Sequence, residues 1–179
     1  MNRYNPDIHH RRSVRLKGFN YSQTGAYFVT ICTRDRVCFL GQIVDGTMTL
    51  SATGLIVEEI WNSLPGRFRG VNIDAFVVMP NHIHGIVLVG AQFVAPEASR
   101  PDEPPKDAMN RAPTLGECVR TFKAASTRLI RVGGNEEFAW QRNYYEHLIR
   151  DDDELGRIRE YIGANPGNWD SDENNILTS

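Results

Sequence analysis

The sequence predicts an α+β fold of the ferredoxin-like, split βαβ type, with an antiparallel sheet, helices packed on one face and a further C-terminal helix. Two observations lead to this class. Segments typical of strands and of helices alternate in the order strand, helix, strand, strand, helix, strand, helix. The length of 179 residues, with 41% hydrophobic and 23% charged side chains, is that of one ordinary globular domain.

We expect a single domain across residues 1–179. It comprises a basic N-terminal arm at 1–20, a flexible Pro-rich loop at 91–113 and a tail at 167–179. Apolar runs are too short for a membrane span, and the amino terminus lacks the apolar region of a secretory signal. Three cysteines without Cys-x-x-Cys spacing predict neither a disulfide framework nor a zinc ribbon. These features favour a cytoplasmic protein without membrane contacts.

Two β segments follow the arm. Residues 27–33 are rich in β-branched and aromatic side chains and predict a central strand. Residues 43–48 predict a small hairpin, because Asp45-Gly46 is a dipeptide that closes two-residue turns.

Residues 51–64 change to helical spacing. The apolar positions that recur in this predicted helix are Leu55, Ile56, Ile60 and Leu64. Pro65 is expected to end the helix, since proline cannot donate the next backbone hydrogen bond.

Pro80-Asn81 joins two apolar runs, and this stretch has the most chemical content. Proline presets φ and asparagine tolerates unusual backbone angles, so residues 73–79 and 82–89 are predicted as an antiparallel hairpin. Alternation places His82 and His84 on one face, about 6–7 Å apart. Two such imidazoles can bind one divalent ion if another element supplies a third group. Without that group, they would be strand histidines that are hydrogen-bonded to backbone or water.

Thr114 and Glu117 have the spacing of a capping box, which predicts that a helix begins here. The side chains expected on its buried side are Leu115, Cys118, Val119, Phe122, Ser126 and Leu129. The residues on a second, mostly basic side are Arg120, Lys123, Thr127 and Arg131. This side is either a solvated helix face or a phosphate-binding surface.

The last two elements bring a phenol and a carboxamide toward the histidines. Residues 140–149 are dense in aromatics and predict an edge strand, and a final helix is expected from Asp151 to Asn165-Pro166. Tyr161 and Asn165 are four residues apart and therefore neighbours on that helix. If the helix lies over the sheet, Asn165 would supply the third, oxygen ligand and Tyr161 would stand beside the ion.

His82-Ile83-His84, after Met79-Pro80-Asn81, resembles the HUH motif (His, hydrophobic, His) of the single-tyrosine transposases, members of the HUH endonuclease superfamily. Four further segments resemble the REP-associated tyrosine transposase branch, and they are residues 11–18, 25–30, 140–147 and 159–166. The resemblance covers nearly the whole chain except residues 91–113 and the tail. A lone His-x-His motif is weakly specific, whereas this ordered set is strongly specific.

The resemblance implies that Tyr161 is the nucleophile and that His82, His84 and Asn165 hold a divalent metal, Mg²⁺ or Mn²⁺. Imidazole ligands by themselves would favour zinc, and the carboxamide shifts the preference toward harder ions. The implied substrate is single-stranded DNA with a hairpin, the repetitive extragenic palindrome. The implied reaction is strand cleavage and transfer through a 5′-phosphotyrosine. The enzyme is expected to act as a monomer or a homodimer.

Basic side chains in the arm, the second helix and the edge strand are the expected DNA contacts. They are Arg11, Arg12, Arg15, Lys17, Arg120, Lys123, Arg131 and Arg142. The net charge of −2 is unusual for this task, with acidic residues gathered at 151–154 and 170–173, and the arm is alternatively a solvated tail.

Other assignments remain open from the sequence. Tyr144 and Tyr145 are rival nucleophiles, or aromatics that pack in the sheet or stack on bases. The chain is alternatively a catalytically silent hairpin-DNA-binding protein with a regulatory role. A third alternative is a small metallohydrolase that acts on nucleotides without a covalent tyrosine intermediate.

Overall fold

The computed structural model describes residues 25–90 and 113–175. Its centre is a four-stranded antiparallel sheet in the order β4-β5-β1-β6. The strands are β1 (Gly25–Cys32), β4 (Val71–Val78), β5 (His82–Val89) and β6 (Tyr145–Ile149). Because β5 and β6 flank β1, the prediction of a central first strand is confirmed.

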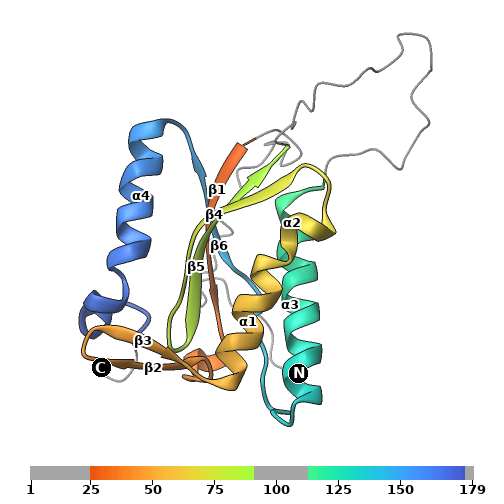
Figure 1. Cartoon of the computed structure of the whole chain (residues 1–179), viewed down its shortest axis with the longest axis vertical. Helices are drawn as coiled ribbons and strands as arrows, with labels where there is room; N and C mark the ends of the chain where they lie inside the picture. The colour runs from red at the N-terminus through yellow and green to blue at the C-terminus, as the bar shows by residue number, and fades with distance from the viewer. Residues whose placement is uncertain (1–24, 91–112, 176–179) are drawn as a thin grey trace, which may run out of the picture.

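Helices lie on both faces of this sheet. Helices α1 (Ala52–Asn62) and α3 (Leu115–Val132) lie together on one face, and α4 (Asp152–Ala164) lies on the opposite face (Figure 1). The predicted α+β class is therefore confirmed, with α4 as the separate C-terminal helix. The smaller elements are η1 (Arg34–Arg36), the hairpin β2 (Gly41–Val44) and β3 (Thr47–Leu50), α2 (Leu64–Arg67) and η2 (Pro166–Ser171).

Side-chain alternation in the strands divides the interior into two hydrophobic clusters. On the α1 and α3 side, Val29 and Ile31 of β1 join a large core that includes Trp61. On the α4 side, Ile86 of β5 and Ile162 of α4 belong to a much smaller cluster. Most of the apolar burial thus lies on the α1 and α3 side, where it contributes most to stability.

The buried side of α1 differs from the predicted one. Val57 and Trp61 are fully buried, whereas Leu55 is 56% exposed. The prediction that Pro65 ends this helix is wrong, because α1 already ends at Asn62 and Pro65 belongs to the next helix, α2. Pro65 lies in the first turn of α2, where its missing N–H has no helical partner to lose.

Helix α3 begins with the predicted capping box. The Thr114 hydroxyl accepts a hydrogen bond from the Glu117 N–H, and the Glu117 carboxylate accepts one from the Thr114 N–H. One predicted core position is wrong, since Leu129 is 37% exposed and its neighbour Ile130 is buried in its place.

The predicted edge strand at 140–149 is shorter in the structure. Strand β6 begins at Tyr145, and Trp140 makes an isolated antiparallel bridge with Thr33. The Trp140 indole N–H donates to the Ser126 hydroxyl of α3 at 2.9 Å. The segment before β6 is therefore bonded both to the end of β1 and to α3.

Some predicted segments lie wholly or largely outside the described residues. They are the arm at 1–20, the Pro-rich loop at 91–113 and the end of the tail at 176–179. The first part of the predicted tail is described and forms η2, followed by an irregular segment up to Asn175. Within the described ranges, no helix is both long and apolar enough to cross a lipid bilayer.

Candidate active site

The two histidines predicted as metal ligands lie together on the α4 face of β5. His82 is opposite Cys32 and His84 is opposite Thr30 in the sheet, so alternation directs both rings to the same side. Their Nε2 atoms are 3.0 Å apart, and the ring planes differ by 72°. Both side chains are buried. The predicted pairing of the two imidazoles on one face is confirmed.

Asn81 determines which nitrogen of His82 carries the hydrogen. Its amide nitrogen donates to the carbonyl oxygens of Arg36 and Asn174, at 3.0 and 2.8 Å, which fixes the orientation of the side chain. Asn81 Oδ1 therefore faces His82 Nδ1 at 2.8 Å and accepts its hydrogen. The lone pair of His82 Nε2 is left pointing toward His84, an arrangement that suits cation binding.

His84 is held by polar and aromatic contacts. Its Nδ1 lies 2.8 Å from the Thr30 hydroxyl oxygen, and its ring stacks on Phe28 with centroids 5.4 Å apart. Burial lowers the pKa of both His82 and His84 to about 3, with a further contribution from the Arg36 charge at His82 and from His82 at His84. Both imidazoles are therefore neutral near pH 7, the form that binds metal ions.

Helix α4 brings Tyr161 to this pair. Its hydroxyl lies 3.4 Å from His84 Nε2, and its ring contacts those of His84 and Phe28. The adjacent Ile162 is buried and fixes the helix, whereas Tyr161 at its edge stays 48% exposed. Burial of the hydroxyl raises the pKa of Tyr161, and the Asn165 side chain acts in the opposite direction. The phenol is thus protonated near neutral pH.

Asp172 is a candidate ligand that the sequence analysis missed. The buried Trp169 anchors η2 beside His82, and the chain then places Asp172 Oδ2 at 3.9 Å from His82 Nε2. The Asn174 N–H donates to the other carboxylate oxygen at 2.6 Å. His82, His84 and Asp172 offer three ligand atoms that all lie within 4.8 Å of one another. The acidic run at 170–173 was a signal, but acidic runs are usually solvated.

Asn165, the predicted oxygen ligand, lies at the junction of α4 and η2, one turn after Tyr161. It is 3% exposed, and its Oδ1 is a buried atom without a hydrogen-bond partner among the described residues. Leaving such an oxygen unsatisfied costs about 1–3 kcal/mol, which a ligand would offset. The two neutral imidazoles and the Asp172 carboxylate form a donor set that fits a divalent cation, and the unsatisfied Asn165 oxygen is a further ligand of the same hard type.

A cavity of about 420 Å³ opens beside His84. Its lining includes His84, Tyr161 and Arg36. The rival nucleophiles Tyr144 and Tyr145 line the same cavity, and the Tyr145 ring also packs edge-on against Phe28. Tyr161 lines this cavity and is 48% exposed, so its side chain is accessible from solvent.

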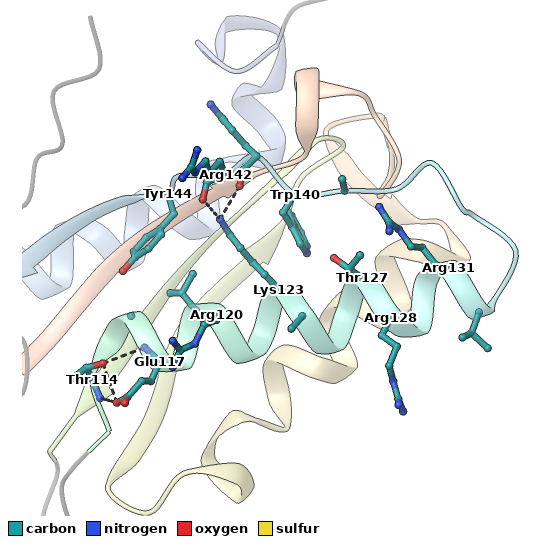
Figure 2. Close-up of a pocket in the computed structure, with 16 residues that line it drawn as sticks. Thr114, Glu117, Arg120, Lys123, Thr127, Arg128, Arg131, Trp140, Arg142 and Tyr144 are labelled. Carbon is teal, nitrogen blue, oxygen red and sulfur yellow. Dashed lines mark hydrogen bonds between the residues drawn. The ribbon is translucent and has the colours of Figure 1, made fainter. Parts of the chain in front are cut away.

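The predicted basic side of α3 lines a different hollow, which we call the α3 groove. It has a volume of about 1150 Å³ and lies between α3 and the segment before β6 (Figure 2). The cationic residues of its lining are Arg120, Lys123, Arg128, Arg131 and Arg142. Its acid, Glu117, already serves the capping box.

Lys123 is more enclosed than the other cations of the α3 groove. Its Nζ donates to the carbonyl oxygens of Gln141 and Arg142 at 2.9 and 3.4 Å (Figure 2). It also donates to the Asn143 carbonyl oxygen at 3.1 Å. Burial lowers the pKa of Lys123 to about 8. Gln141 and Tyr144 line both the α3 groove and the cavity at Tyr161, so the two hollows share a wall.

The remaining predicted DNA contacts belong to the N-terminal arm. They are Arg11, Arg12, Arg15 and Lys17, and they lie outside the described residues. The structure thus brings His82, His84 and Tyr161 together, and it places the α3 cations in a separate groove.

Comparisons with known proteins place the chain in a sequence family and identify its fold. No family model matches the sequence. An uncharacterized protein of Haemophilus influenzae is 42% identical over 175 residues, which cover 96% of each chain. The solved structure of a REP-associated tyrosine transposase bound to a REP hairpin superposes with a TM-score of 0.53 at 19% identity, over 93% of this chain and 73% of that one. The chain therefore belongs to the same family as the Haemophilus influenzae protein, and it shares the fold of the solved REP-associated tyrosine transposase.

Proposed function

We propose that this protein is a metal-dependent DNA strand transferase that acts on single-stranded hairpin DNA through a 5′-phosphotyrosine at Tyr161. The observation that supports this most strongly is the Tyr161 hydroxyl at 3.4 Å from His84 Nε2. A tyrosine that only packs would not need a half-exposed ring beside two buried, neutral imidazoles. The shared fold with a transposase that was solved with a REP hairpin supports DNA as the substrate class.

In the proposed step, Tyr161 Oη attacks the phosphorus of a phosphodiester and the bond from phosphorus to the 3′-oxygen breaks. The phenol proton passes to solvent, because the raised pKa keeps the hydroxyl protonated before attack. The departing 3′-oxygen takes a proton from solvent. Attack of a 3′-hydroxyl on the phosphotyrosine reverses the exchange and joins strands. Each step replaces one phosphate ester by another, so a nucleotide cofactor is not required.

The proposed metal ligands are His82, His84 and Asn165, with Asp172 as an additional candidate. A bound Mg²⁺ or Mn²⁺ would supply positive charge to the nonbridging phosphate oxygens. The orientation of His82 is fixed before a metal binds, because Asn81 holds its ring. Such supporting hydrogen bonds set the tautomer and orientation of metal-binding histidines.

Two basic surfaces, the α3 groove and the N-terminal arm, are the proposed contacts for the phosphates of the DNA backbone. In the groove, Arg120, Arg131 and Arg142 join Lys123 around one hollow (Figure 2). Arg11, Arg12, Arg15 and Lys17 are the corresponding residues of the arm. Removing a cation that contacts phosphate should lower the slope of log affinity against log salt by about 1.

The test uses a library of labelled single-stranded oligonucleotides, each with a palindromic hairpin and randomised flanks, in Mn²⁺. We expect the wild-type protein to form an adduct that survives a denaturing gel. Tyr161→Phe should lose the adduct while it still binds hairpins, because only the hydroxyl is removed. Tyr145→Phe is the matched control, since Tyr145 lines the same cavity. His82→Ala with His84→Ala, or added EDTA, should also abolish the adduct.

The outcomes separate the alternatives. An adduct that persists in Tyr161→Phe would exclude Tyr161 as the nucleophile. Hairpin binding without an adduct in Mg²⁺ or Mn²⁺ would indicate the catalytically silent binding protein. Release of nucleotides without a covalent intermediate would indicate a metallohydrolase.

A further inference from the structure

One positively charged side chain that lines the cavity at Tyr161 has no role in the proposed reaction. Arg36 lines this cavity together with His84 and Tyr161. Among the described residues of the lining it is the only lysine or arginine, and the lining also includes the acid Glu173. A phosphodiester at Tyr161 would therefore approach Glu173, and the negative charge of Asp172 also acts at Tyr161. A positive group is needed there to offset this repulsion.

The backbone at Arg36 adopts a conformation that most residues avoid. Asp35 and Arg36 have φ angles of 56° and 54°, both in the left-handed region. Buried side chains hold this turn, because the Thr33 hydroxyl contacts the Val37 carbonyl oxygen at 2.8 Å and Asn81 Nδ2 donates to the Arg36 carbonyl oxygen at 3.0 Å. Unfavourable backbone conformations that surrounding bonds maintain are concentrated at functional sites.

One of these bonds also links Arg36 to the histidines through Asn81. The Asn81 amide that donates to the Arg36 carbonyl oxygen also accepts the hydrogen of His82 Nδ1 at 2.8 Å. At its other end, Arg36 Nη1 donates to the Glu173 carbonyl oxygen at 2.7 Å. The arginine is thus held at both ends, and it lines the same cavity as His84 and Tyr161.

We propose that Arg36 is a catalytic residue that binds a nonbridging oxygen of the phosphodiester attacked by Tyr161. This inference rests on the proposed function. A guanidinium has five N–H donors in one plane, and among the described residues that of Arg36 makes a hydrogen bond only to Glu173. Its remaining donors suit a phosphate oxygen. Negative charge on that oxygen makes such a donor most valuable during bond exchange.

The test compares Arg36→Gly with Arg34→Ala in single-turnover adduct formation, on the library oligonucleotide that the wild-type protein attacks fastest. Glycine tolerates the positive φ at this position, so Arg36→Gly should fold with a thermal midpoint at or above that of the wild type. Its rate of adduct formation should fall roughly 100-fold. Arg34 lies in the same turn with a 58% exposed side chain and donates to Glu137, so Arg34→Ala should keep the wild-type rate.

A second substrate separates a role in charge neutralisation from a merely structural one. A methylphosphonate at the attacked position lacks the negative charge, so Arg36→Gly should slow its reaction far less than it slows the phosphate. An equal loss on both substrates, or a wild-type rate for Arg36→Gly on the phosphate, would overturn the role of Arg36 and leave the proposed function standing. Absence of a wild-type adduct would overturn both.

Discussion

Both faces of β5 are largely buried, but they have different chemistry. Ile83 and Val87 point toward α1 and α3 and are fully enclosed by apolar neighbours. His82 and His84 point toward α4 and are also buried, but a carboxamide and a hydroxyl contact them. Burial alone therefore does not distinguish the core from the candidate site. The distinguishing feature is a set of polar partners that orient buried groups toward one point.

The comparison implies that the α1 and α3 face supplies most of the stability. Trp61 is fully buried there and stacks on Phe76 with centroids 4.8 Å apart. Trp61→Ala should lower the free energy of unfolding by about 3–5 kcal/mol, because it opens a large cavity. Urea unfolding measures this loss. Leu55→Ala on the same helix is the control and should change stability by less than about 0.5 kcal/mol, since Leu55 is exposed.

Close packing of the same face makes Gly85 sensitive to an added methyl group. A Cβ at this position would lie 2.3 Å from Trp61 Cζ2. Gly85→Ala should therefore destabilise the protein by about 1–3 kcal/mol through overpacking. Gly156→Ala in α4 meets no atom within 4 Å and should stabilise the helix by about 0.5–1 kcal/mol. Equal responses of the two glycines would contradict the close packing of Trp61 against Gly85.

The buried histidines should make the free energy of unfolding depend on pH. Burial lowers the pKa of His84 to about 3 in the folded state, whereas an unfolded histidine titrates near 6.5. The unfolded state therefore binds more protons as the pH falls below about 6.5, and stability declines toward pH 3. His84→Gln removes one such group and should reduce the slope of unfolding free energy against pH by about 1.4 kcal/mol per unit between pH 4.5 and 6. Unfolding titrations across this range would show an unchanged slope if His84 were exposed to solvent.

Sequence patterns located the strands and helices better than they located buried sides. Leu129 and Ile130 are adjacent apolar residues, as are Leu55 and Ile56, and helical spacing alone does not say which residue of such a pair faces the core. The tertiary contacts of α1 and α3 decide this. Strict alternation has no such ambiguity in a strand, which is why the shared face of His82 and His84 was predictable.

The candidate site was only partly predictable for a related reason. Tyr161 and the two histidines have recognisable spacing, but Asp172 reaches the site because η2 packs its buried Trp169 beside His82. Asn81 has a turn residue's usual place beside proline, and nothing local indicates that its side chain orients His82. Arg36 depends on an unusual backbone conformation that its own sequence does not signal. Contacts between distant segments create these three roles.

The most direct measurement maps the covalent attachment. A trapped protein–DNA adduct would be digested with nuclease and protease, and the peptide that carries a nucleotide would be identified by mass spectrometry. We expect a nucleotide on Tyr161, bonded to the phenolic oxygen through its 5′-phosphate. Attachment at Tyr144 or Tyr145, or DNA cleavage with no modified tyrosine, would contradict it.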